Sequence, residues 1–242
     1  YATSEKIYVH YHAYEDVGLC DFIQGLLHID FNKREDPDIP HPVLYQPIQP
    51  VVGKKISINY LFQRLNSFLD KNTVVIADTG DAMFGAMDMA IHSETEFLAP
   101  AYYASMGFAV PGSLGVQLAD SNLRPLVLVG DGAFQMTGME LSTAARYKLS
   151  PIVIILNNSG YGTERPMLDG LFNDVNSWEY SLIPDIIKAG RGFDVKTEDD
   201  LDEALQLSCK YTEDICILDV QIDHGDMSLA LERMTKAFAR QI

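Results

Sequence analysis

Short apolar runs alternate with helix-like patterns along residues 53–242, and this alternation constrains the fold more than any other feature of the sequence. Such alternation is typical of an α/β fold, with an open, mostly parallel sheet and helices on both faces. Thr197, followed three residues later by Asp200, predicts the N-cap of one helix. The expected strands are 73–77, 97–102, 126–129, 152–156, 193–196 and 215–220, and the expected helices are 57–69, 105–119, 138–148, 181–189, 198–211 and 228–240.

The first 52 residues follow a different pattern. One strand is expected at 7–12, and a helix with an apolar face follows it, but one strand and one helix cannot close a core. Residues 30–52 contain five prolines, which exclude a helix or a central strand and indicate an extended linker. We therefore expect part of a second domain at 1–29, a linker at 30–52 and one large domain at 53–242, in a chain that is a portion of a longer one.

Composition and charge exclude several classes of protein. The chain is 47% hydrophobic and 21% charged, so it can bury a core and is not disordered. Its net charge of -16 opposes binding to nucleic acid or to an anionic membrane surface, and no apolar run approaches the roughly 20 residues of a membrane span. Three scattered cysteines indicate neither a disulfide framework nor a zinc site, which is consistent with a cytoplasmic protein.

Polar residues follow two consecutive predicted strands. Gly130, Asp131 and Gly132 follow the strand at 126–129, and an Asn157 to Gly160 run follows the next. With one helix between them, these strands are expected to be parallel neighbours, so that Asp131 and Asn158 emerge at the same edge of the sheet. Either loop alone could be an ordinary turn, but the two together favour a ligand site.

The residue types in these loops indicate a magnesium site with a bound anion. Carboxylate, amide and carbonyl oxygens suit Mg²⁺ or Ca²⁺, and Mg²⁺ commonly shares its ligand shell with substrate phosphates. Gly130 and Gly132 allow a close backbone approach, and a helix beginning near Gly138 would direct its positive end toward the anion. Because the net charge is -16, a metal ion or a helix N-terminus is needed to hold any anionic ligand.

The sequence resembles the thiamine diphosphate enzymes at these positions. Gly130-Asp131-Gly132, 24 intervening residues and Asn157-Asn158 match their magnesium and diphosphate motif. The resemblance covers 53–242, and residues 1–29 resemble the end of the central domain of the same enzymes. Residues 130–137 and 157–165 are most similar to 2-oxo acid decarboxylases of the indolepyruvate and phenylpyruvate type.

The resemblance implies a set of site residues. Asp131, the Asn158 side chain and the Gly160 carbonyl would bind Mg²⁺. Met106 would separate the two rings of a bent cofactor, and the Ala104 carbonyl would accept a hydrogen bond from its aminopyrimidine. The full set of implied cofactor-binding residues is Thr79, Gly80, Asp81, Ala104, Ser105, Met106, Asp131, Gly132, Ala133, Asn158, Gly160, Tyr161, Gly162 and Thr163.

The resemblance also implies an activity, a lyase reaction in which a 2-oxo acid, expected to be aromatic, yields an aldehyde and CO2. Glu164 matches the acidic residue that these decarboxylases place over the reacting centre, and it would assist proton transfer from a partly buried position. Carboligases of the acetolactate synthase type differ at this point in sequence. A carboligase, a two-chain decarboxylase subunit and a non-catalytic module that binds thiamine diphosphate remain the alternatives.

One residue that the family needs has no match in this chain. A glutamate must face the pyrimidine ring from a separate N-terminal domain, usually that of a neighbouring subunit, and the pair of adjacent histidines typical of decarboxylases is absent as well. His10 and His12 do not match that pair and are expected to be structural. The implied partners are a small 2-oxo acid and a pyrimidine-binding domain, in a homodimer or homotetramer, and the chain alone is expected to be inactive.

Overall fold

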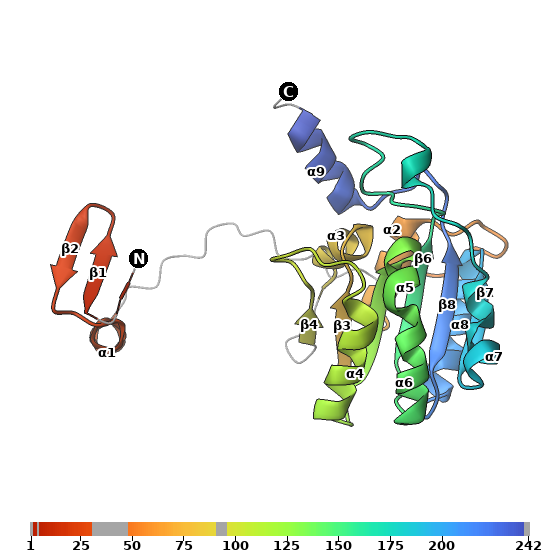
Figure 1. The fold of residues 1–242 in the computed structure, drawn as a ribbon, viewed down its shortest axis with the longest axis horizontal. Helices are drawn as coiled ribbons and strands as arrows, with labels where there is room; N and C mark the ends of the chain where they lie inside the picture. The colour runs from red at the N-terminus through yellow and green to blue at the C-terminus, as the bar shows by residue number, and fades with distance from the viewer. Residues whose placement is uncertain (1, 4, 31–47, 91–95, 240–242) are drawn as a thin grey trace. The chain divides into compact units, whose positions relative to one another are not determined.

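The computed structural model describes residues 2–3, 5–30, 48–90 and 96–239. It divides into two compact units, Tyr1–His41 and Pro42–Ile242, which are described separately (Figure 1). Most of the expected linker, residues 31–47, lies outside the described residues.

The first unit contains a β-hairpin and a helix. Strand β1 (Lys6–Val9) pairs antiparallel with β2 (His12–Glu15), and α1 (Leu19–Leu27) follows. The single strand expected at 7–12 is therefore wrong: the chain reverses at His10, whose φ of 52° is the left-handed conformation that a tight hairpin connection uses. The predicted helix is confirmed.

The second unit is built on a six-stranded, wholly parallel sheet with the order β4-β3-β5-β6-β8-β7. This confirms the α/β fold, an open parallel sheet with helices on both faces. The strands are β3 (Thr73–Ala77), β4 (Glu96–Leu98), β5 (Arg124–Gly130), β6 (Ile152–Asn157), β7 (Arg191–Val195) and β8 (Cys216–Gln221).

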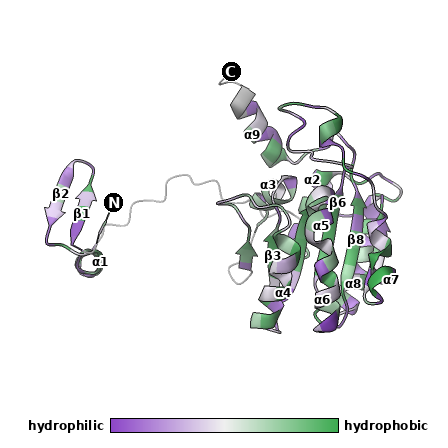
Figure 2. Cartoon of the chain, viewed as in Figure 1, coloured by the Kyte–Doolittle hydropathy of each residue, from purple (hydrophilic) through white to green (hydrophobic). Residues whose placement is uncertain are grey.

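Helices bury both faces of the sheet, which explains why its central strands are continuous apolar runs. Figure 2 shows these strands as predominantly hydrophobic. The helices are α2 (Ile58–Asn66), α3 (Asp81–Met87), α4 (Ala109–Ala119), α5 (Asp131–Thr137), α6 (Leu141–Arg146), α7 (Ile183–Ile187), α8 (Glu198–Lys210) and α9 (Leu229–Ala239), with 3-10 turns at Gly138–Glu140, Leu171–Asn173 and Tyr180–Leu182. In β3, Val75 and Ala77 pack with α2, α3 and α8, whereas Val74 and Ile76 pack with α4, α5, α6 and α7.

Two helices near the carboxyl end of the sheet were not expected, and two expected boundaries there are wrong. The helix expected from Gly138 corresponds to the 3-10 turn at Gly138–Glu140 and α6, whereas α5, which begins at Asp131 directly after β5, and α3 were not expected. The strand expected at 97–102 ends at Leu98, two residues before Pro100, which cannot donate to a strand ladder. The helix expected from Ser105 begins only at Ala109, because Gly107 has a φ of 82°. The Thr197 and Asp200 capping box is confirmed.

Among the described residues, no helix has the length and apolar character needed to cross a membrane.

Candidate functional site

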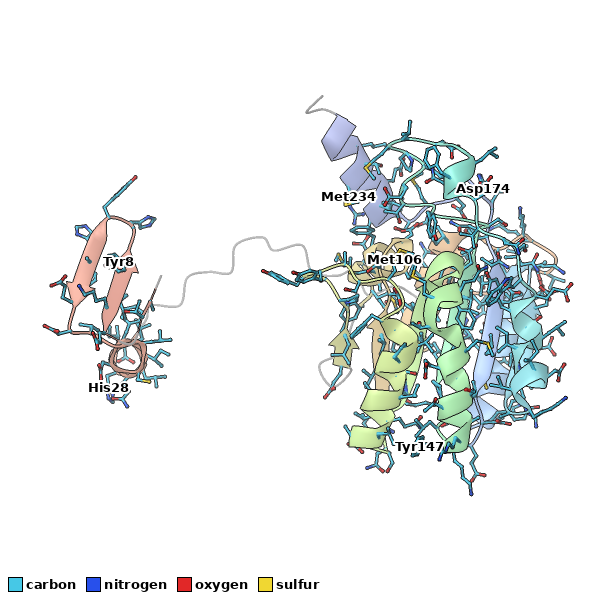
Figure 3. All side chains as sticks on the ribbon, viewed as in Figure 1. Tyr8, His28, Met106, Tyr147, Asp174 and Met234 are labelled. Atoms are coloured by element: carbon cyan, nitrogen blue, oxygen red, sulfur yellow. The ribbon has the colours of Figure 1, made fainter. Side chains whose placement is uncertain are left out.

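A cavity of about 420 Å³ lies where β3, β5 and β6 end, and it collects the residues that the sequence predicts. Every predicted site residue lines it except Ser105. Figure 3 labels Met106, which reaches the cavity from the segment before α4. The sequence did not predict the apolar part of the wall, which consists of Ile58, Ala82, Met83, Phe84, Leu156 and Ile222.

Asp131 is the first residue of α5 and is 1% exposed. Its Oδ1 accepts a hydrogen bond from its neighbour Gly132 N at 2.7 Å, and its Oδ2 accepts one from Gly160 N at 3.0 Å. The second bond joins the start of α5, directly after β5, to the loop after β6. Strands β5 and β6 pair in parallel, as the sequence predicts. The two strands therefore bring Asp131 and Gly160 together.

Burial raises the pKa of Asp131 to about 6, although hydrogen bonds from Gly132, Gly160 and Ser159 act in the opposite direction. The protein without cofactor therefore keeps a carboxylate where charge is unfavourable. A bound cation would relieve that cost, since an opposite charge favours the ionised form.

This pKa predicts how pH changes the stability of the protein when cofactor and metal are absent. The pKa of Asp131 in the folded protein lies above its ordinary value of 3.8. Its contribution to the free energy of unfolding is therefore complete below pH 3.8 and is lost as pH rises toward about 6. The loss amounts to roughly 3 kcal/mol. The free energy of unfolding of the native protein and of Asp131→Asn is measured by chemical unfolding in EDTA. As pH rises, the native protein should lose stability relative to the variant. A difference that stays constant with pH would contradict the assignment.

The loop after β6 approaches its neighbours so closely that glycine is required at position 160. A Cβ on Gly160 would lie 2.2 Å from the backbone carbonyl oxygen of Asn173, whereas one on Gly162 would meet the end of the Asn158 side chain, 2.5 Å from Nδ2. The Gly160 carbonyl accepts a hydrogen bond from Gly162 N at 3.0 Å, which leaves one of its two lone pairs for another partner.

The chemistry of the lining suits a magnesium-bound diphosphate. Among the described residues of the lining, no side chain is basic, and the charged ones are Asp81, Asp131 and Glu164. No group of three His, Cys, Asp or Glu that could hold a metal occurs in the described part of the chain. A magnesium ion on Asp131 would therefore have few protein ligands and would leave positions for phosphate oxygens and water, as Mg²⁺ prefers.

The Thr79 to Asp81 run forms the turn between β3 and α3. The Thr79 hydroxyl is buried without a hydrogen-bond partner, and Gly80 has a φ of 103°. A Cβ on Gly132, which also lines the cavity, would lie 2.5 Å from the ring of Tyr161. An unpaired buried hydroxyl and a glycine cradle are both features that fit a bound polar group.

Asp81 lines the cavity but also binds the start of α9. Its carboxylate accepts hydrogen bonds from Ser228 N at 2.8 Å and from the Ser228 hydroxyl. Leu231 on α9 is buried, and Arg233 donates hydrogen bonds at 2.6 Å to Asp88, the residue that follows α3. The helix expected at 228–240 therefore packs against α3 beside the cavity (Figure 1).

Glu164 lines the cavity, but its side chain is exposed, so the expected partly buried position is wrong for this chain. No described residue covers it enough to bury it. Its neighbour Arg165 binds Asp169 at 2.7 Å and Asp174 at 2.8 Å. These two ion pairs of Arg165 therefore stabilise the loop that carries Glu164.

The segment before α4 depends on a residue that sequence reasoning missed. Ala104 and Gly107 both have left-handed backbones, with φ of 50° and 82°, and this conformation costs an alanine roughly 1–2 kcal/mol. The segment is tied to β3 by Asp78, a fully buried carboxylate that follows the strand. The only sequence signal for Asp78 is an acidic residue at the end of an apolar run.

Comparison with known proteins agrees with this site. Residues 70–220 match the family described as "Thiamine pyrophosphate enzyme, C-terminal TPP binding domain", thiamine pyrophosphate being another name for thiamine diphosphate. The chain is 32% identical to an indole-3-pyruvate decarboxylase of Azospirillum brasilense, over 99% of this chain and 44% of that protein. It is 27% identical to a pyruvate decarboxylase of Neurospora crassa, over 89% and 39%. A probable pyruvate decarboxylase of Schizosaccharomyces pombe is 29% identical, over 74% and 32%.

The chain spans less than half the length of these relatives. The match to the cofactor-binding domain covers most of the second unit, and the site residues lie within or next to it. The chain therefore belongs to the thiamine diphosphate-dependent 2-oxo acid decarboxylase family and carries its C-terminal cofactor-binding domain.

Proposed function

We propose that this chain is the cofactor-binding part of a thiamine diphosphate- and Mg²⁺-dependent enzyme that converts a 2-oxo acid into an aldehyde and CO2. The observation that carries the proposal is a cavity at the carboxyl edge of the sheet whose lining joins Asp131 and Gly160 and has no basic side chain among its described residues. A diphosphate in such a cavity needs a metal ion to offset the negative side chains.

Asp131, the Asn158 side chain and the Gly160 carbonyl would hold the metal. All three residues line the cavity, and the hydrogen bond from Gly160 N to Asp131 keeps two of them adjacent. The Thr79 hydroxyl and the backbone around Gly80, Gly132 and Ala133 would contact the rest of the cofactor, together with the backbone near Gly162 and Thr163.

Bound thiamine diphosphate would supply an electron sink for the bond that breaks when CO2 leaves. This chain would orient the cofactor: Met106 would lie against its rings, and the Ala104 carbonyl would accept a hydrogen bond from the pyrimidine. Glu164 would deliver a proton to the substrate carbon that has lost its carboxyl group, and release of the aldehyde follows.

The partner would be a pyrimidine-binding domain, supplied by another part of the native protein or by a second subunit of a homodimer or homotetramer. Tyr102 and Tyr103 support this, because their side chains are 95% and 82% exposed on the segment that leads to Met106. Contact with another domain would bury these rings and would also cover Glu164.

The substrate is proposed to be an aromatic 2-oxo acid such as indolepyruvate or phenylpyruvate. The apolar wall of the cavity and the relative named indole-3-pyruvate decarboxylase support this, whereas the other relatives described above are named pyruvate decarboxylases. Glu164 supports decarboxylation over a purely binding role, because binding alone needs no acidic side chain for proton transfer at the cavity.

The test is aldehyde release by the intact native protein, with whatever further domains it carries, supplied with Mg²⁺ and thiamine diphosphate. Indolepyruvate, phenylpyruvate and pyruvate are compared at equal concentration. We expect all three to yield aldehyde, with kcat/KM higher for the aromatic acids. Higher kcat/KM for pyruvate would contradict the aromatic preference, and a 2-hydroxy ketone or acetolactate product without aldehyde would show a carboligase. No turnover of any substrate would contradict the proposed activity.

A further inference from the structure

Asp78 lies at the carboxyl end of β3, immediately before the Thr79 to Asp81 run, and its side chain is 0% exposed. Its backbone N donates a hydrogen bond to the carbonyl of Leu128 at 2.8 Å, which fixes the residue to β5. The carboxylate is therefore held rigidly beside the cavity by the central strands of the sheet.

The carboxylate of Asp78 joins two segments that are distant in sequence. Its Oδ1 accepts hydrogen bonds from Thr79 N at 2.9 Å and from Gly107 N at 3.0 Å, and its Oδ2 accepts one from Ala109 N at 2.8 Å. Burial raises the pKa of Asp78, whereas these three N–H groups and that of Phe108 act in the opposite direction. Both oxygens thus accept hydrogen bonds from backbone groups, at Thr79 and in the segment that leads into α4.

The segment that Asp78 fixes carries Ala104 and Met106, which line the cavity. The same segment is bound from its other side, because the Thr137 hydroxyl donates to the Gly107 carbonyl at 2.8 Å. Ala104 has a left-handed backbone, a conformation that a residue other than glycine keeps only where neighbouring groups enforce it. Among the described residues, the side chains of Asp78 and Thr137 both bind the backbone of Gly107, three residues further along the same segment.

We propose that Asp78 is a positioning residue for the cofactor: its two carboxylate oxygens hold the 104–107 segment against the end of β3, so that Ala104 and Met106 face the bound rings. This inference rests on the proposed function. It requires two acceptor oxygens at position 78, and a side chain of the same shape with one acceptor does not suffice.

Two substitutions separate the acceptor role from packing. Asp78→Asn keeps the size of the side chain but turns an amide N–H₂ toward a backbone N–H, whereas Asp78→Glu keeps both oxygens and adds a methylene. Glu198→Gln is the matched control, because Glu198 is a buried carboxylate outside the cavity that accepts a hydrogen bond from Val51 N at 2.9 Å. The dissociation constant for thiamine diphosphate is measured in the intact native protein by calorimetric titration at saturating Mg²⁺.

We expect Asp78→Asn to weaken cofactor binding at least about tenfold, the effect of losing a hydrogen bond to a charged acceptor. Asp78→Glu should bind more tightly than Asp78→Asn, and Glu198→Gln should match the native protein. Tighter binding by Asp78→Asn than by Asp78→Glu, or native affinity in Asp78→Asn, would overturn the positioning role. Absence of binding by the native protein itself would instead overturn the proposed function.

If circular dichroism shows that Asp78→Asn is unfolded, Thr137→Val decides the question. This substitution keeps the shape of Thr137 and removes the hydroxyl that binds Gly107 from the other side. Cofactor binding should weaken about threefold or more, as expected for one neutral hydrogen bond. Native affinity in Thr137→Val would overturn the claim that the fixed segment positions the cofactor.

Discussion

Asp131→Ala should abolish the rise in melting temperature that Mg²⁺ plus thiamine diphosphate gives the intact native protein. Asp131 is the proposed charged ligand of the metal, and no basic side chain among the described lining residues could take its place. A ligand at a hundredfold excess over its Kd stabilises the protein by about 2.7 kcal/mol, so complete loss of binding removes a shift of several degrees.

The control for Asp131→Ala is Glu198→Gln, which alters a buried carboxylate away from the cavity and should keep the full shift. Because burial raises the pKa of Asp131 to about 6, the substitution also removes an unfavourable buried charge. The variant without cofactor should therefore remain folded, so that a missing shift reports binding. A shift equal to that of the native protein would contradict the metal assignment.

Glu164→Gln should lower kcat by a factor of roughly 10² to 10⁴, the range that a general acid or base contributes. Cofactor affinity should change little, because Glu164 lies on the exposed side of the cavity while Asp131 and Gly160 carry the proposed metal. The amide keeps the shape of the side chain but cannot transfer a proton. The measurement is steady-state aldehyde release beside a titration of the cofactor.

Glu140→Gln provides the matched control, since Glu140 is an exposed carboxylate outside the cavity. It should leave both kcat and cofactor affinity unchanged. If Glu164→Gln retained native kcat, Glu164 would be excluded from proton transfer. If it lost cofactor affinity in proportion to activity, its role would be binding.

The central sheet could be predicted from the sequence because both of its faces are buried. A strand such as β6 is then apolar along almost its whole length, and the pattern is visible without knowledge of its neighbours. The hairpin at His10 and the early end of β4 could not be predicted in this way. Each depends on the backbone angles or hydrogen bonds of one or two residues, which an apolar run does not encode.

The candidate site was predictable where it depends on neighbouring strands and not where it depends on distant segments. The closeness of Asp131 and Gly160 follows from the parallel pairing of β5 and β6. The bonds from Asp78 to Gly107 and from Asp81 to Ser228 join residues that are far apart in sequence. No local pattern indicates such pairs, and Ser105, which the resemblance implies together with Ala104 and Met106, lies outside the lining of the cavity.

The most direct test of this account is calorimetric titration of thiamine diphosphate into the intact native protein, once with Mg²⁺ and once with excess EDTA. The described lining of the cavity is acidic and has no basic side chain, so the diphosphate should bind only when the metal is present. We predict a clear binding isotherm with Mg²⁺ and none after chelation. Equal affinity in both titrations would contradict the proposal that a metal on Asp131, Asn158 and Gly160 holds the cofactor.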